Sequence, residues 1–136
     1  MKNVFTLLLL VLPIILLCQN TETKPAKIRY SNGFFNTKWE IGDKDAVPKD
    51  VQLHLDKYDN EASFNFKRAD ALEKETLIFT LIGSVGMLVG VLAKDGTSLI
   101  GYSSAVVFYG LSLGTSISSK KKYDKAVNGY NKKFGY

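Results

Sequence analysis

The side chains that could support catalysis are few and lie far apart in the chain. The sequence holds one His, His54, and one Cys, Cys18. A general base needs a partner and a pocket, but His54 lies between two leucines on an expected short helix, off its apolar stripe. We therefore interpret His54 as a solvated surface residue. We expect no enzyme activity, no catalytic residue and no cofactor.

Metal and ligand motifs give the same answer. The carboxylates between residues 43 and 59 lack the spacing of a calcium-binding loop, and one Cys with one His cannot form a dedicated Cys/His metal site. Sequence motifs of hydrolases, zinc proteases and phosphate-binding loops do not occur in the chain. We infer no metal site and no small-molecule substrate.

Charge is distributed unevenly along the chain. It has 18 Lys and Arg against 13 Asp and Glu. Residues 19–75 hold 10 basic and 11 acidic side chains, whereas residues 119–136 hold six lysines and one Asp. The positive excess therefore lies in the C-terminal tail, which argues against a nucleic-acid-binding fold.

Two uncharged stretches dominate the second half of the chain. Residues 76–93 and 96–119 contain no charged side chain, and only Lys94 and Asp95 separate them. At about 1.5 Å per residue they would form helices of roughly 27 and 36 Å, close to the apolar thickness of a bilayer. Residues 76–119 are therefore predicted to form a transmembrane helical hairpin.

The N-terminus resembles an export signal. Lys2 precedes an apolar run that is too short for a comfortable span, so residues 1–18 are interpreted as a signal peptide or an N-terminal anchor. Cleavage after Cys18, lipidation of Cys18 and retention as an anchor remain alternatives. Each of them places residues 19–75 outside the cytoplasm. We expect a periplasmic segment of a bacterial envelope protein, in the inner or the outer membrane.

Residues 19–75 are predicted to form a small α+β segment. Aromatic and β-branched runs on both sides of Asn32-Gly33 predict a β-hairpin over residues 28–41. Residues 45–48 are expected to form a turn. A short helix should follow from Pro48, with Val51, Leu55 and Tyr58 on one stripe. A second helix, capped by Asp59 or the next residue, should continue directly into the first span.

Small residues form stripes on both predicted spans. On the first span they follow Phe79 at helical spacing, and on the second they fall on two nearly opposite faces. One of these faces should pack against the first span, because membrane helices use small residues at contacts. The other should bind a second copy or another membrane protein. The proposed helix-packing residues are Gly83, Gly86, Gly90, Gly101, Ala105, Gly110 and Gly114.

The hydroxyls of the second span allow an alternative interpretation. Eight Ser and Thr side chains between residues 97 and 118 could line a wet interior, as in holin-like pore formers. Neither span contains an ionisable side chain, which is the usual mark of an ion path. Helix packing is therefore favoured over a pore. A membrane-tethered binding module is the third possibility.

The two spans also resemble a known type of protein. The glycines of residues 83–90 and those between Gly101 and Gly114 are similar to the pattern of glycine-zipper two-helix proteins of the Gram-negative envelope. Residues 126–131 resemble the ending of small, uncharacterised exported proteins of such bacteria. The resemblance implies membrane-embedded assembly or envelope maintenance.

The tail, residues 120–136, combines aromatic and basic side chains. Tyr123, Val127, Tyr130 and Phe134 recur at helical spacing, and most lysines lie off that stripe. This pattern is typical of an amphipathic helix that lies in the membrane interface, although a solvated, frayed end is the alternative. The expected lipid-contacting lysines are Lys120, Lys121, Lys122, Lys125, Lys132 and Lys133. Their number on the exported side conflicts with the positive-inside rule. Either the rule is overridden, the hairpin lies in the outer membrane, or the second span does not cross fully.

Overall fold

A computed structural model describes residues 24–32, 37–93 and 97–136. The expected signal segment with Cys18, the Gly33 position of the hairpin turn and residues 94–96 lie outside the described residues. The rest of the chain forms a small sheet, one short helix and two long helices. The prediction of a mainly helical chain with a small β segment and two long apolar helices is confirmed.

The sheet has three antiparallel strands in the order β1-β2-β3. Strands β1 (Ile28–Asn32) and β2 (Thr37–Ile41) form the expected hairpin, with Tyr30 opposite Trp39. Gly42 has a φ of +66°, which glycine adopts without steric cost, and it turns the chain into β3. Strand β3 (Lys44–Ala46) corrects the predicted turn over residues 45–48: its first residues pair with Ile41 and Glu40.

Helix α2 (Pro48–Tyr58) begins with proline in its first turn and buries Val51 and Leu55, as predicted. Asp59 then separates it from α3 (Asn60–Leu92). The Asp59 carboxylate accepts hydrogen bonds from the backbone N–H groups of Glu61 and Ala62, at 3.1 and 3.2 Å. This cap satisfies two of the donors that a helix N-terminus leaves unpaired.

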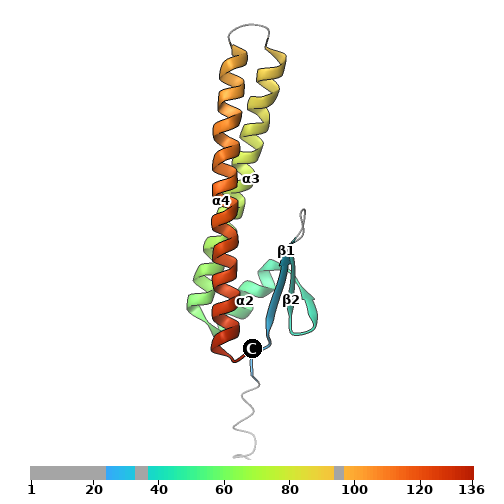
Figure 1. Cartoon of the computed structure of the whole chain (residues 1–136). Helices are drawn as coiled ribbons and strands as arrows, with labels where there is room; N and C mark the ends of the chain where they lie inside the picture. Colours follow the sequence, from blue (N-terminus) through green and yellow to red (C-terminus); the bar gives the residue numbers. More distant parts are fainter. Residues whose placement is uncertain (1–23, 33–36, 94–96) are drawn as a thin grey trace, which may run out of the picture.

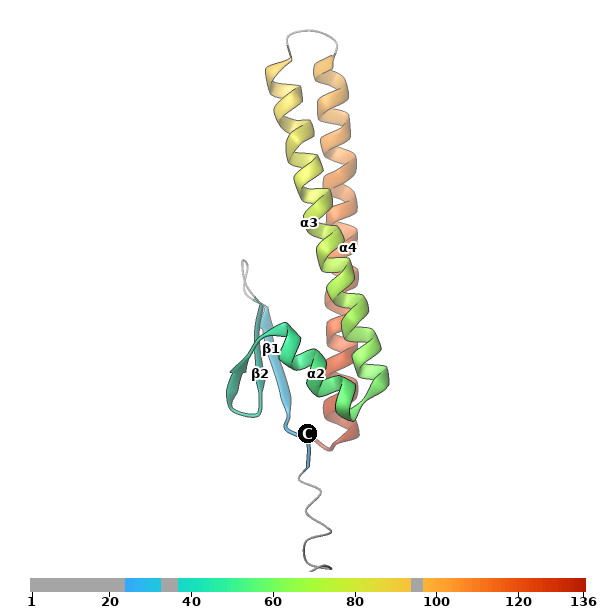
Figure 2. The same cartoon turned by 180° about the vertical axis from the view of Figure 1, so that it is seen from behind.

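The two long helices pack against each other in antiparallel fashion along their length (Figures 1 and 2). Helix α3 continues without a break from its cap into the uncharged stretch, as expected. Helix α4 (Thr97–Lys133) includes both the second uncharged stretch and the basic residues after it. At about 1.5 Å per residue the helices are roughly 50 and 55 Å long. The sheet and α2 lie beside one half of this pair only.

The core lies where the sheet and α2 meet the N-terminal part of α3 and the C-terminal part of α4. We call this unit the head. Trp39 is its centre: its ring lies 4.9 Å from that of Tyr30, 5.2 Å from Phe66 and 5.1 Å from Tyr123. The other large, fully buried side chains are Ile28, Val51, Leu55 and Tyr130. The uncharged parts of the two helices, which we call the rod, extend from the head.

The burial of the tail overturns one prediction. Tyr123, Val127 and Tyr130 were expected to face lipid, but their side chains are buried in the head core. Asn131 also binds the sheet: its side-chain amide donates to the carbonyl of Ile28 and accepts from the Ile28 N–H, at 2.7 and 3.1 Å. The tail is therefore part of the folded head, and neither a frayed end nor a separate helix in the membrane interface.

Candidate membrane-contact and helix-packing surfaces

The small residues of the rod lie where α3 and α4 approach most closely. Gly83, Gly86 and Gly90 on α3 and Gly101 on α4 are buried. A Cβ atom added at Gly101 would lie 2.7 Å from the Cα of Gly90 and 2.8 Å from the carbonyl oxygen of Gly86. Backbone therefore packs against backbone here, and no larger residue fits at Gly101 without moving the helices apart.

Hydroxyl groups join the two helices below this contact. Thr76 bonds to Thr115 and Thr80 bonds to Ser112, each at 2.7 Å between oxygens. Thr80 also donates to the Thr76 carbonyl of its own helix. All four of these hydroxyls thus have a partner on the other helix and a backbone carbonyl to which they donate.

The second small-residue face of α4 points away from α3. A Cβ atom added at Gly110 or Gly114 would meet nothing within 4 Å, and Ser103 and Ser118 on the same side are exposed. By contrast, Ala105 and Ser112 of the opposite face are buried against α3. Ser116, which helical spacing places on the same side as Ala105 and Ser112, is exposed.

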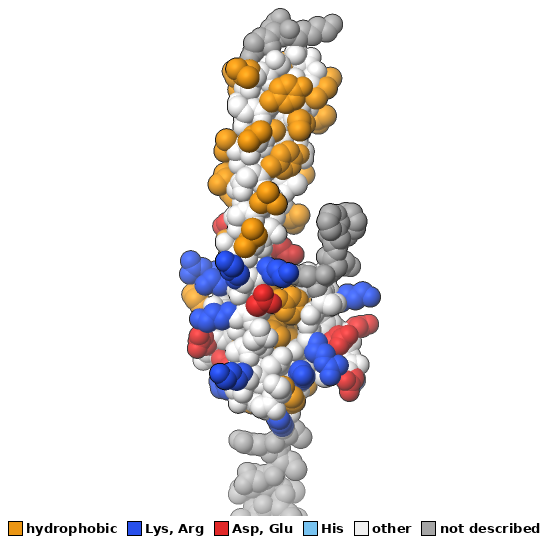
Figure 3. Space-filling model, in the orientation of Figure 1, with side chains coloured by type: hydrophobic (Ala, Val, Ile, Leu, Met, Phe, Trp, Pro, Cys, Tyr) orange, Lys and Arg blue, Asp and Glu red, His pale blue; other side chains and the backbone are white. Residues whose placement is uncertain are grey.

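Large apolar side chains cover the outside of the rod. Leu88 is 60% exposed, Val106 72% and Leu113 66%. Both long helices are long and apolar enough to cross a membrane, and only 17% of the most apolar window of each is buried. Figure 3 shows apolar side chains over the rod and charged ones over the head. The exposed apolar side chains of the rod include Leu77, Ile78, Leu81, Val85, Leu92, Leu99, Ile100, Val107, Leu111 and Ile117.

The six lysines of the tail are separated by the fold. Lys120 and Lys121 are exposed next to the rod, whereas Lys125 and Lys133 form ion pairs with Glu61 and Asp59 near the start of α3, each at 3.3 Å. At about 1.5 Å per residue, Lys133 lies roughly 20 Å further along α4 than Lys120. Lys132 shares that distant position. Only the run at residues 120–122 adjoins the apolar surface.

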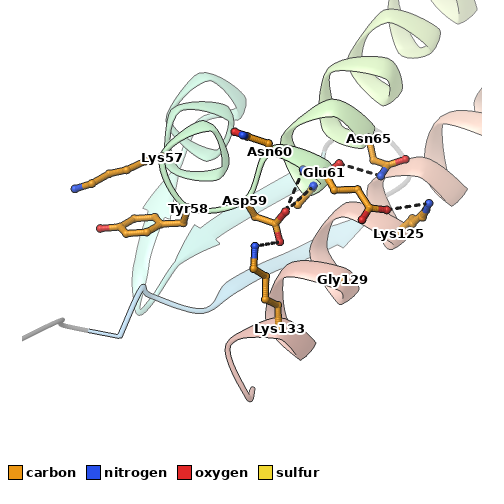
Figure 4. Close-up of a pocket in the computed structure, with 10 residues that line it drawn as sticks. Lys57, Tyr58, Asp59, Asn60, Glu61, Asn65, Lys125, Gly129 and Lys133 are labelled. Atoms are coloured by element: carbon orange, nitrogen blue, oxygen red, sulfur yellow. Dashed lines mark hydrogen bonds and ion pairs between the residues drawn. The ribbon is translucent and has the colours of Figure 1, made fainter.

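A polar depression lies at that distant end of the head (Figure 4). Its volume is about 620 Å³. The residues of the two ion pairs just described line it, together with Gly129. Asn65 donates to the backbone carbonyl of Glu61 at 3.0 Å rather than into the space. Within the described ranges no group of three or more His, Cys, Asp and Glu side chains is placed to hold a metal ion.

His54 differs from its interpretation as a solvated residue. Its Nε2 lies 2.7 Å from the hydroxyl of Tyr130, which donates to the carbonyl of Ala26 at 3.0 Å. Burial lowers the pKa of His54, and the positive charge of Lys57 adds to this, against an opposing contribution from the Ala26 backbone. The side chain joins α2 to α4 and to the segment before β1. This is a structural role that sequence spacing did not show.

Two tyrosines tie the tail to the head through carboxylates. The Tyr30 hydroxyl bonds to Asp124, and the Tyr123 hydroxyl donates to Glu73 at 2.8 Å. Burial and these carboxylates raise the pKa of both tyrosines. Both phenols therefore stay protonated at neutral pH and act as hydrogen-bond donors.

Comparison with known proteins adds no further constraint. No protein-family model, curated protein or solved structure matches this chain.

Proposed function

We propose that this protein is a small integral membrane protein of the bacterial envelope with a structural or assembly role. Its helical hairpin inserts into the bilayer and holds the head at the membrane surface. The observation that carries the proposal is the outward-facing apolar surface of the rod, since the most apolar windows of its helices are only 17% buried. Buried helices of water-soluble proteins cover such side chains, because exposing a large apolar patch to water is unfavourable.

The side of the membrane is proposed from the N-terminal signal and the architecture together. The head contains residues from both before and after the hairpin, so these two parts of the chain share one side. Export of residues 19–75 would therefore carry the tail to the periplasm as well. The many lysines of the tail then stay on the exported side because the tail is folded into the head.

Lateral assembly is the second component of the proposal. Helices associate in lipid through close packing of small residues, and the face with Gly110 and Gly114 has no partner in the described chain. A second copy of this chain or another membrane protein would pack there. The resemblance to glycine-zipper envelope proteins supports the same interpretation. The pore alternative is less well supported, because Ser112 and Thr115, two of the eight hydroxyl side chains of the second span, form hydrogen bonds to the other helix.

Replacing both outward-facing glycines should abolish oligomers. In the Gly110→Leu, Gly114→Leu double variant, chemical cross-linking in membranes should give monomer only, because the leucines prevent close backbone approach. The matched control is Leu81→Ile with Leu88→Ile, which changes exposed side chains of α3 and leaves the face with Gly110 and Gly114 unaltered. Cross-linked oligomers that persist in the glycine variant would refute assembly through this face. They would leave membrane insertion itself untouched.

A further inference from the structure

The base of the rod carries a cluster of positive charge that two helices build together. Ser119 on α4 donates to the carbonyl of Ala69 on α3 at 2.9 Å, which brings Arg68 and the lysines after Ser119 to the same level of the helix pair. We define the basic belt as Arg68, Lys120, Lys121 and Lys122; all but the half-buried Lys122 are exposed. Figure 3 shows Lys and Arg side chains gathered where the rod meets the head.

Most carboxylates around the belt form an ion pair or a hydrogen bond with a side chain outside the belt. Asp70 pairs with Lys74 at 2.7 Å, Glu73 accepts from Tyr123, and Asp124 accepts from Tyr30. Farther along α3, Lys67 pairs with Asp56 at 2.8 Å. The only carboxylate of this region without a bond to another described residue is that of Glu75. No cation of the belt forms an ion pair with any residue that the structure describes. A hydrogen bond from a neutral tyrosine leaves a carboxylate charged, so Glu73, Glu75 and Asp124 contribute three negative charges against the four positive charges of the belt. The belt therefore keeps a net excess of one positive charge.

The belt lies just below the headgroup layer of a bilayer, within reach of its long side chains. Along the helix axes, Arg68 is about 12 Å below Thr76 and residues 120–122 are about 8–11 Å below Thr115, and long basic side chains extend toward the membrane interface. The Thr76–Thr115 contact marks the start of the uncharged rod, and Ser119 follows Thr115 by about one helical turn, or roughly 5–6 Å. The polar layer on each side of the hydrocarbon core is of similar depth, since about 30 Å of hydrocarbon lies within a 40–45 Å bilayer. Lys125 and Lys133 are about 15 and 27 Å below Thr115, and so lie beyond that layer.

We infer that the basic belt binds the phosphate groups of anionic phospholipids, and that the hairpin is surrounded preferentially by such lipids at the side of the head. Clustered basic side chains next to a membrane span favour anionic lipid by roughly 1 kcal/mol per side chain near the surface, a contribution that salt screens. The inference rests on the proposed insertion of the hairpin. It adds the class of lipid and assigns Arg68, a residue outside the tail, to the contact.

The test uses the full-length protein in bilayers of phosphatidylcholine with a spin-labelled lipid as probe. The fraction of probe immobilised at the protein surface is compared for phosphatidylglycerol and phosphatidylcholine headgroups. We expect a preference for phosphatidylglycerol on the order of fivefold at low salt. It should fall toward one in the Lys120→Gln, Lys121→Gln, Lys122→Gln variant, and fall partly in Arg68→Gln.

The matched control removes the same charge elsewhere: Lys44→Gln, Lys57→Gln, Lys132→Gln, all exposed side chains of the head. This control should keep the preference. Equal probe immobilisation for the two headgroups in the unaltered protein, or an equal loss in the two triple variants, would overturn the inference. If the preference for phosphatidylglycerol were unchanged in Arg68→Gln, a contribution of α3 to the belt would be excluded. Failure of the hairpin to insert would appear separately, as absence of any immobilised probe with either headgroup.

Discussion

Replacing Gly101 by leucine should force the two helices of the rod apart. A Cβ atom at this position meets the backbone of α3 at Gly90 and Gly86, and backbone cannot move aside as a flexible side chain can. We expect the distance between spin labels at the exposed residues Val91 and Leu99 to rise by on the order of 2–3 Å, toward the spacing of helices with larger side chains at the contact. Double electron–electron resonance in lipid bilayers measures this distance. Overpacking should also cost about 1–3 kcal/mol of hairpin stability.

The matched control for this experiment is Gly110→Leu on the same helix. It introduces the same side chain and the same gain in helix propensity, roughly 0.8–1 kcal/mol, but its Cβ meets nothing within 4 Å. The label distance should therefore stay the same. If Gly101→Leu and Gly110→Leu gave equal distances, the close approach of the helices at Gly101 would be wrong.

Ending the chain after Lys122 should unfold the head and leave the rod helical. The deletion removes Tyr123, Ala126, Val127 and Tyr130 from the core, and the large ones among them contribute about 1.5–3 kcal/mol each through burial. Their sum is comparable to the whole stability of a small domain, about 5–15 kcal/mol. The single tryptophan, Trp39, reports the result, because it packs directly on Tyr123. Its fluorescence emission should shift to the red, and the near-ultraviolet circular dichroism of the head should be lost.

A point substitution separates this loss from mere shortening. Tyr123→Ala keeps the chain length and should destabilise the head by about 3–5 kcal/mol, as truncation of a large buried aromatic side chain does. Gly129→Ala lies on the outer surface of the same helix, where a Cβ meets nothing, and should leave the tryptophan emission unchanged. A native emission spectrum after truncation at Lys122 would restore the interpretation of the tail as a separate interfacial helix.

Local signals in the sequence predicted the main elements well. The uncharged runs marked the rod, because no charge can be accommodated there if the helices face lipid. Asp59 marked the start of α3, because a carboxylate before a helix satisfies its free N–H groups. The aromatic and β-branched runs marked β1 and β2. All of these signals act within a few residues of the element that they define.

The misassigned parts depend on contacts between distant segments. Strand β3 is three residues long and polar, so it forms because Ile41 and Glu40 offer it pairing groups and not because of its own pattern. The apolar stripe of the tail was recognised, but a stripe shows only that a helix face is covered and not what covers it. A two-stranded β-hairpin is only marginally stable alone. The need of the β1–β2 hairpin for a surface to pack on was therefore the available signal. The rings of Trp39 and Tyr123 pack against each other, although these residues are far apart in the sequence.

The small-residue faces of α4 also show that sequence periodicity does not reveal which face contacts another segment. Helical periodicity separated the two faces of α4, and Gly101 and Ala105 indeed lie against α3 while Gly110 and Gly114 do not. Sequence alone did not choose which face would do so. The structure also divides the tail lysines into a group beside the rod and a group ion-paired far from it, since α4 continues straight past residue 119.

The depth of the rod in a bilayer tests the central proposal most directly. Single cysteines at Leu88 and Val106, in a Cys18→Ser background, would carry spin labels on exposed positions of α3 and α4. A label at Lys57 in the head serves as the aqueous reference. The proposal predicts that oxygen, which concentrates in the hydrocarbon, relaxes the labels at Leu88 and Val106, whereas a water-soluble nickel chelate relaxes only the label at Lys57. Strong relaxation of the Leu88 and Val106 labels by the nickel chelate would place the rod in water and contradict the account.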